Sequence, residues 1–404
     1  MCLKLSKLNL LVYDSKAIPL ITLLFKLFLE SGAILHKFVL FNSGFLKFEL
    51  EIFHSLEQFV QFYTRLQDLS LEIISNFSIG NIAKLLRVLA KNNTKISVLR
   101  LAFHSKYESK LIHILFPALI HFIKSQEQLR KFILCGRDDC PTEFYGIISA
   151  LESQKNTLQE VILAGCVFSA EYKVLNNCKN LETLRISDCD TELLKLLDYN
   201  ISTLEISLPY FRYDELEPII IQILEKIGIL LQRLKIDTGI VIREESLILE
   251  ALKSFCPNII YLYITNIRLS TQFLELIDNL QKLQFLSLGY AYDTPKERVM
   301  QFAKILPSTL QYLDIALGLT DTLLDSFIDI FLDHCNAPLK KLLISSRNLN
   351  NEKNTKALIR YCTRIRTLNY VGIVKDYDYL GYDIRNELEK YVTLAPYDHI
   401  VVYC

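Results

Sequence analysis

One pattern constrains this chain more than any other feature. The spacing Leu-x-x-Leu-x-Leu, with Ile, Val, Phe or Tyr in place of Leu, recurs from one end to the other. A single copy would mean little, because 73 of the 404 residues are leucine. We count 14 copies, from Leu5-Leu8-Leu10 to Ile365-Leu368-Tyr370, at intervals of about 28 residues. So many copies at a near-constant interval predict a fold built from stacked structural repeats.

Each repeat predicts one short strand and one helix. The last two apolar positions of a copy alternate with polar residues, which is typical of a half-buried strand. The segments between copies show helical apolar spacing, clearest at 81–91, 142–151, 215–230, 247–255, 271–280 and 321–332. Ser246, Ser270 and Thr320 are expected to cap three of these helices. Between Leu181 and Ile201 the interval contracts, which leaves room for one short helix at most.

A strand and a helix in every repeat of this length predict an α/β leucine-rich-repeat solenoid, a horseshoe. Parallel strands would line the concave face, helices the convex face, and leucines the space between them. We expect residues 1–404 to form a single domain of about 14 repeats. The chain has only 12 glycines and 10 prolines. Gly-rich phosphate loops and Pro-rich linkers are therefore not expected.

The cysteines and the apolar segments indicate the cellular compartment in which the protein is expected. None of the ten cysteines forms a CxxC pair, and the chain is not a small Cys-dense scaffold, which favours reduced thiols in the cytoplasm or nucleus. Asp14 and Lys16 interrupt the apolar amino-terminal segment, so it does not fit a signal peptide. The apolar runs 17–29 and 111–123 are too short to span a bilayer.

Five cysteines occupy set positions in the repeats. A Cys-x-x-Leu/Ile step precedes the strand at Cys178, Cys256 and Cys362, in CKNLETLRI, CPNIIYLYI and CTRIRTLNY. Cys166 and Cys189 follow a strand, in LAGC and ISDC. A cysteine there is a small apolar group with a weak S–H donor, which suits a buried turn. The pattern resembles the cysteine-containing repeats of F-box/LRR proteins, the substrate receptors of SCF-type ubiquitin ligases, and the resemblance covers essentially the whole chain.

The F-box itself is not detected. In that family it is a helical motif, usually amino-terminal, that binds an adaptor of the ligase. Residues 1–45 instead carry the repeat pattern, in LSKLNL and LHKFVL. Two alternatives follow: the protein works without an F-box, or it is a relative whose F-box segment is absent.

Charge and motifs exclude several classes of function. The 45 basic and 45 acidic residues give no net charge, which argues against a general binder of nucleic acid or of anionic membranes. The sequence has no GxSxG, GxxxxGK[ST], GxGxxG, HExxH or DxDxDG motif. Its seven histidines are scattered. We therefore expect no enzyme activity, no cofactor and no metal site.

The concave face is the place where function is expected. Side chains flanking the central leucine of each strand point away from the helices, because side chains alternate along a strand. Aromatic residues from three consecutive repeats are expected to form an exposed patch beside a patch of mixed charge, and exposed aromatics next to arginine are typical of protein interfaces. The alternative is that helices or loops cover the patch. The predicted binding residues are Arg185, Glu205, Arg233, Lys235, Tyr261, Tyr263, Phe285, Tyr312 and Asp314.

These observations predict a protein–protein interaction module that binds its protein substrate on the concave face. The resemblance implies the substrate-recognition subunit of an SCF-type ubiquitin ligase, with adaptor and cullin subunits as further partners. A scaffold or regulator of the ribonuclease-inhibitor-like class, outside any ligase, is the alternative. The final segment, DHIVVYC at 398–404, is expected to be a last strand or a cap.

Overall fold

The structure is a computed structural model. Its residues group into two compact units, Met1–Asn200 and Ile201–Cys404, which we describe separately. The residues described are 8–10, 23, 27, 30, 34–40, 60–73, 79–103, 111–136, 144, 146–167, 169–190, 192–195, 200–208, 216–239, 242, 244–289, 295–315, 328–345, 351–374, 381–402 and 404.

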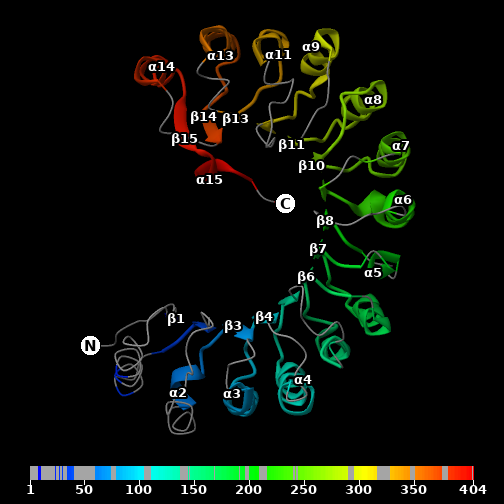
Figure 1. Ribbon diagram of the computed structural model, residues 1–404, viewed down its shortest axis with the longest axis vertical. Coiled ribbons are helices and arrows are strands. Elements are labelled where there is room, and N and C mark those ends of the chain that lie inside the picture. The colour runs from blue at the N-terminus through cyan, green and yellow to red at the C-terminus, as the bar shows by residue number, and fades with distance from the viewer. Residues whose placement is uncertain are drawn as a thin grey trace. The chain divides into compact units, whose positions relative to one another are not determined.

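The first unit alternates parallel strands with helical segments (Figure 1). Each strand pairs in parallel with the next one in the sequence. Its strands are β1 (Leu8–Leu10), β2 (Lys37–Leu40), β3 (Asp68–Ile73), β4 (Val98–Phe103), β5 (Lys131–Gly136), β6 (Glu160–Ala164) and β7 (Thr183–Ser187). Its helical segments are α2 (Val60–Tyr63), α3 (Ile79–Asn92), η4 (Leu111–Leu115), α4 (Phe116–Ser125), η5 (Ser149–Gln154), η6 (Ala170–Asn177) and α5 (Glu192–Lys195).

The repeated leucines form the core between strands and helices. In β4, Leu99 and Leu101 are fully buried, and Leu101 lies in register with Leu71 of β3 and Leu134 of β5. The helix α3 turns an apolar face toward them, because its buried residues recur with helical spacing. Stacking of equivalent apolar side chains therefore holds each repeat to its neighbours.

The helical segments become shorter toward β7. Instead of the helix predicted at 142–151, residues 146–148 form a turn that leads into the 3₁₀ helix η5. Gly146 has a positive φ of 86°, and its N–H donates to the Glu171 carboxylate at 2.8 Å, so the chain does not enter an α-helix there. The prediction of one short helix in the contracted repeat is confirmed, because α5 has only four residues.

A ladder of three buried side-chain amides joins four repeats of the first unit, and the sequence pattern did not reveal it. Asn93 donates through Nδ2 to the carbonyl oxygens of Tyr63 (2.7 Å) and Leu66 (2.9 Å). Gln126 donates through Nε2 to the carbonyl oxygen of Asn93 (3.1 Å), and Gln154 to that of Gln126 (2.7 Å). Each amide thus donates to backbone carbonyl oxygens of the preceding repeat, and such hydrogen bonds offset the cost of burying polar groups.

The second unit repeats the same plan, again with each strand paired in parallel to the next. Its strands are β8 (Thr203–Leu208), β9 (Arg233–Thr238), β10 (Tyr261–Thr265), β11 (Phe285–Gly289), β12 (Tyr312–Asp314), β13 (Lys341–Ser345), β14 (Tyr370–Val374) and β15 (Thr393–Pro396). Its helical segments are α6 (Leu216–Ile227), η7 (Gly228–Leu230), α7 (Glu245–Phe255), α8 (Thr271–Asn279), α9 (Lys296–Ile305), α11 (Ile328–His334), α13 (Glu352–Ile365), α14 (Tyr382–Leu388) and α15 (Tyr397–Ile400).

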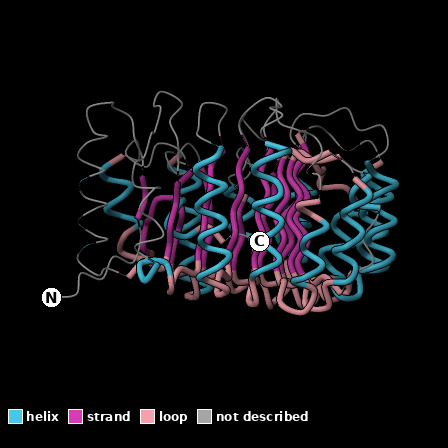
Figure 2. Tube along the Cα trace, turned by 90° about the horizontal axis from the view of Figure 1, so that it is seen from below, coloured by secondary structure: helices cyan, strands magenta, loops and turns pink. Residues whose placement is uncertain are grey.

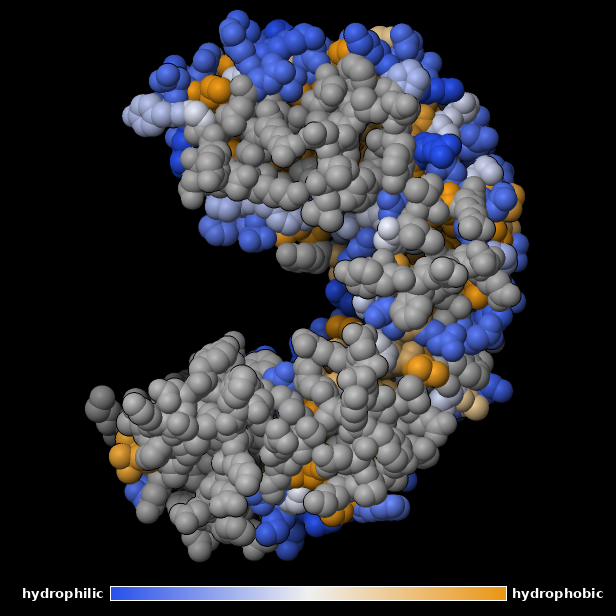
Figure 3. All heavy atoms as spheres, viewed as in Figure 1, coloured by the Kyte–Doolittle hydropathy of each residue, from blue (hydrophilic) through white to orange (hydrophobic). Residues whose placement is uncertain are grey.

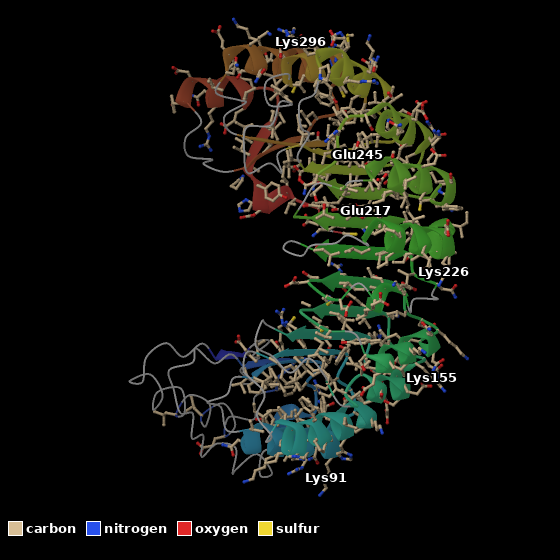
Figure 4. All side chains as sticks on the ribbon, turned by 45° about the vertical axis from the view of Figure 1, so that its right-hand side comes forward. Lys91, Lys155, Glu217, Lys226, Glu245 and Lys296 are labelled. Atoms are coloured by element: carbon tan, nitrogen blue, oxygen red, sulfur yellow. The ribbon has the colours of Figure 1, made fainter. Side chains whose placement is uncertain are left out.

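Strands and helices form separate layers in both units. Figure 2 shows the strands running side by side, and Figure 3 shows hydrophilic side chains over the outer helices. The labelled side chains of Lys91, Lys226 and Lys296 project from helical segments on the side away from the strands (Figure 4). Among the described residues, no helix is both long and apolar enough to cross a membrane.

The helix caps match the prediction in one of three places. Ser270 caps α8, and its hydroxyl accepts a hydrogen bond from the N–H of Phe273 at 3.2 Å. Ser246 is not a cap, since α7 begins one residue earlier, at Glu245. Thr320 and the first residues of the predicted helix 321–332 lie outside the described residues.

The last predicted repeat is shifted by three residues. The helix α13 continues to Ile365 and ends at Arg366, whose φ of 52° places it in the left-handed region. The strand β14 therefore begins only at Tyr370, and Val371, not Leu368, pairs with Leu342 of the preceding strand. Cys362 lies inside the helix and not in the turn before the strand. A further strand, β15, was not predicted, because its TLAP sequence lacks the repeated spacing.

The other four cysteines at set repeat positions occupy buried turns, as predicted. They are Cys166, Cys178, Cys189 and Cys256. The Sγ of Cys189 accepts a hydrogen bond from the N–H of Cys166 at 3.3 Å, one repeat away. Cys256 is fully buried against Gly228, where a Cβ would come within 2.8 Å of its sulfur. Burial raises the pKa of Cys178 to about 11 and that of Cys256 to about 12, so both stay neutral thiols at physiological pH.

Candidate protein-binding surface

The predicted aromatic residues come together on three adjacent strands. We use "strand face" for the side of the sheet away from the helices. Tyr261 of β10 lies in register with Phe285 of β11, which lies in register with Tyr312 of β12. The ring centroids are 6.2 Å apart for the first pair and 5.9 Å for the second. The leucines beside them are buried toward the helices, so the predicted alternation of these strands is correct.

The expected exposure of this surface is wrong for three of its residues. Only 2% of Tyr261, 1% of Tyr312 and none of Asp314 is accessible to solvent. The cause is the carboxy-terminal segment, Tyr397–Cys404, which we call the tail. After β15 the chain forms the short helix α15 and returns along the strand face of the second unit (Figure 1). The tail is thus a cover over the patch and not a last strand.

Two tyrosines hold a single residue of the tail by its backbone. The Tyr261 hydroxyl donates to the carbonyl oxygen of Val402 at 3.2 Å. The Val402 N–H donates to the Tyr312 hydroxyl oxygen at 3.3 Å. Both backbone groups of Val402 are therefore satisfied by side chains of β10 and β12, a pair that we call the tyrosine clamp. Burial raises the pKa of both tyrosines, so both hydroxyls stay protonated, Tyr261 as the donor and Tyr312 as the acceptor.

A buried carboxylate anchors the other end of the tail. The Tyr397 hydroxyl donates to Oδ2 of Asp314 at 3.4 Å, and the Ser287 hydroxyl donates to the same oxygen at 3.1 Å. A buried carboxylate is costly unless it accepts hydrogen bonds. The tail therefore completes a polar site that the strands provide only in part.

An apolar cluster lies beside these two polar contacts. Ile400 of the tail packs against Tyr312 and Leu343, and Phe285 flanks the cluster. Gly372 of β14 forms the floor, because a Cβ at this position would lie 2.7 Å from Cδ1 of Ile400. The absence of a side chain at Gly372 is thus what lets Ile400 approach the sheet.

Charged residues border the aromatic patch in the second unit, as the sequence predicts. Lys235 forms an ion pair with Glu205 at 2.7 Å and lies over the ring of Tyr263, 4.9 Å from its centroid. The Arg233 guanidinium lies 4.7 Å from the centroid of the Tyr261 ring. These cation–π contacts fix the basic side chains beside the aromatic rings.

Arg185 belongs to the first unit, and the eight other predicted residues belong to the second. On the strand face there, Glu160 of β6 pairs with Lys131 of β5 at 2.8 Å and with Arg185 of β7 at 3.2 Å. All three side chains are half-buried. Together they form a polar cluster that we call the first-unit charge cluster.

Comparison with known proteins gives the fold. No family model matches the sequence, and no curated protein matches it. In a structure described as the Rad7 and Elc1 complex in yeast, a chain is similar to this one, with a TM-score of 0.51 and 15% identity, over 95% of this chain and 94% of that chain. The leucine-rich-repeat-containing protein LegL7 from Legionella pneumophila has a TM-score of 0.41 and 13% identity, over 69% of this chain and 88% of its own.

The repeats, the parallel strand order and the layered helices define an α/β leucine-rich-repeat solenoid. Within the part of the chain that the structure describes, no three His, Cys, Asp or Glu side chains are grouped so that they could hold a metal ion. The aromatic residues described above, and the charged residues beside them, lie on the strand face.

Proposed function

We propose that this chain is a protein-recognition subunit that binds a target protein on its strand face. The observation that carries the proposal is the set of aromatic and basic side chains that adjacent strands bring together in the second unit. Tyrosine and arginine in partly desolvated settings are the residues on which protein interfaces most often depend. Their surroundings carry both signs of charge, which suits a protein partner better than nucleic acid.

The proposed setting is an SCF-type ubiquitin ligase, in which the chain is the substrate receptor. Its role is positioning: the solenoid, acting as a single domain, holds the target within reach of a ubiquitin-transferring enzyme carried by other subunits. The cysteine positions in the repeats support this setting through their resemblance to F-box/LRR proteins. The similarity to a chain of the Rad7 and Elc1 complex supports a role in which the solenoid works with partner subunits.

The test is quantitative affinity purification of the tagged full-length chain from crosslinked cells. We expect the adaptor and cullin subunits to co-purify, together with a target whose amount falls when the charges of the Lys235–Glu205 pair beside the aromatic patch are exchanged by K235E and E205K. Because those substitutions lie on the strand face, they should leave adaptor and cullin recovery unchanged. The matched control exchanges the charges of an exposed helix pair, K356E with E352K.

Two outcomes would count against the proposal. Recovery of a target without adaptor or cullin, even under crosslinking, would exclude the ligase setting and leave the scaffold alternative. A target bound equally well by the wild-type and charge-exchanged chains would exclude the strand face of the second unit as its binding surface.

A further inference from the structure

The tail contacts the strand face of the second unit in the manner of a bound peptide. Only part of the tail is buried: Ile400 and Cys404 are buried, whereas Asp398 and His399 are exposed and Val401 and Val402 are half-buried. Its contacts reach far back along the chain, since Val402 meets Tyr261 across 141 positions and Tyr312 across 90. The contacting side chains stand in adjacent repeats of the second unit.

The receptor surface offers three different recognition elements. The tyrosine clamp binds one peptide N–H and one peptide C=O, and any residue except proline can supply both of these groups. The space left by the missing side chain of Gly372 accepts a branched aliphatic side chain, here that of Ile400. The Asp314 carboxylate accepts a hydrogen bond from an aromatic hydroxyl, here that of Tyr397.

The short helix α15 sets the spacing between these elements. Tyr397 and Ile400 are three positions apart and therefore lie on the same side of the helical turn, both facing the sheet. After Val401, whose ψ is 138°, the chain is extended and presents Val402 to the clamp. A ligand of this surface thus needs one helical turn followed by an extended residue.

We propose that this surface is a peptide-binding site which the tail occupies in cis, and that it binds a partner segment of the same chemistry once the tail is displaced. The partner segment carries a tyrosine, a β-branched aliphatic residue three positions later, and a residue other than proline two positions after that. The inference rests on the proposed function, because it names the regulation and the partner chemistry of the same strand face. The tail keeps the site closed until a segment of higher affinity replaces it.

The experiment measures binding of a synthetic peptide to the full-length chain. The probe is the tail sequence 397–404 with serine in place of the last cysteine, labelled with a fluorophore and followed by anisotropy. Two variants, which we call the loosened chains, each remove one contact between the tail and the strand face. The substitution I400D removes the aliphatic side chain that packs at Gly372. The substitution V402P removes the N–H that donates a hydrogen bond to the Tyr312 hydroxyl. Proline fits at this position because Val401 already has the extended ψ that a residue before proline adopts. The control chain is L247D, changed at an exposed leucine of α7.

We expect the peptide to bind the I400D and V402P chains at least tenfold more tightly than it binds the wild-type or L247D chain. Adding Y261F and Y312F to the I400D chain should weaken that binding about tenfold. A peptide that itself carries proline at the position of Val402 should bind at least tenfold more weakly than the unchanged peptide.

Two results would overturn the inference. If both loosened chains keep the wild-type circular dichroism spectrum and bind the peptide no better than wild type, the surface does not bind such segments. If both chains unfold, the tail is an integral part of the fold and cannot be displaced. The assay contains no ligase subunit, so its failure leaves the proposed function standing. Failure to recover adaptor and cullin would in turn leave the peptide result standing.

Discussion

The hydroxyl oxygen of Tyr312 accepts a hydrogen bond from the backbone N–H of Val402, 90 positions further along the chain. Tyr312 belongs to the strand β12, and Val402 belongs to the tail. The sequence predicts Tyr312 on an exposed face, and the tail that makes this contact buries it. The first two predictions concern the tail that this bond holds.

The substitution Y312F should loosen the tail without unfolding the repeats. Phenylalanine keeps the ring but removes the acceptor, and a hydrogen bond of this kind contributes about 1 kcal/mol. We expect the Val402 amide to exchange with deuterium about fivefold faster, as measured by hydrogen-exchange mass spectrometry or NMR. The control is Y361F, whose hydroxyl bonds to Ala337 and Leu339 away from the tail. Unchanged Val402 exchange in Y312F would show that this bond does not hold the tail.

The substitution G372A should disturb the tail through a clash. The added methyl would lie 2.7 Å from Cδ1 of Ile400 and 3.0 Å from Cγ of Leu343, and overpacking of this kind costs about 1–3 kcal/mol. Shortening Ile400 in the double variant G372A/I400A should recover part of that loss in a double-mutant cycle measured by urea unfolding. The control is G80A in α3, where a Cβ meets nothing within 4 Å, and it should be neutral or stabilising. Additive effects of G372A and I400A would contradict the contact.

The amide ladder predicts a large cost for Q126L. Leucine leaves the Asn93 carbonyl without its donor and the Ile96 N–H without the Oε1 acceptor that lies at 3.1 Å. Two buried groups without partners should lower the free energy of unfolding by about 2–4 kcal/mol. The control is Q281L at an exposed position, which should lower the free energy of unfolding by less than about 1 kcal/mol. Water there replaces the hydrogen bond that the Gln281 side chain donates to the Asp278 carbonyl oxygen. Equal urea midpoints for the two variants would contradict the ladder.

The buried thiols predict a loss of stability in alkali. Burial raises the pKa of Cys256 to about 12, whereas in the unfolded chain the thiol titrates near its ordinary value of 9.0. Above pH 9 the unfolded state binds fewer protons than the folded state, so the free energy of unfolding falls as pH rises toward 12. The contribution of this thiol is fully present below pH 9. We expect C256A to show a shallower decline in urea midpoint between pH 8 and pH 11 than wild type does.

The half-exposed Cys135 supplies the control for that measurement. The variant C135A should follow the wild-type pH dependence. A decline as steep in C256A as in wild type would assign the alkaline loss to other groups, such as the buried tyrosines, whose pKa values are also raised.

The repeat spacing alone predicts most of the strands, because apolar residues at fixed intervals can be buried together only in stacked repeats. It fails at the last repeats, where the helix α13 is longer than the spacing allows for and Leu368 takes an earlier position in the repeat. The repeat spacing also does not identify Asn93 and Gln126 as structural residues. These lie three positions before a repeat's first apolar residue, the place that Cys178 and Cys256 hold in other repeats, so a search for any small or hydrogen-bonding residue there would have found them.

The aromatic patch shows a different limit of prediction. Strand alternation places Tyr261, Phe285 and Tyr312 correctly on one face, since it depends on neighbouring residues only. Whether that face is open depends on where a distant segment docks, and the tail has no repeated pattern that would indicate its position. That residues 1–404 act as one domain, and that the nine selected residues bind a protein, stay predictions.

The distance in sequence between the tyrosine clamp and its ligand has a consequence for synthesis. Strand pairing joins residues about one repeat apart, so the patch can form as soon as β12 has left the ribosome. Val402 follows Asp314 by 88 positions, which at about 5–20 residues per second is a delay of roughly 4–18 s. Each newly made chain therefore passes through an interval in which the patch is complete and the tail does not yet exist. A partner segment that binds the tyrosine clamp during that interval meets no competitor.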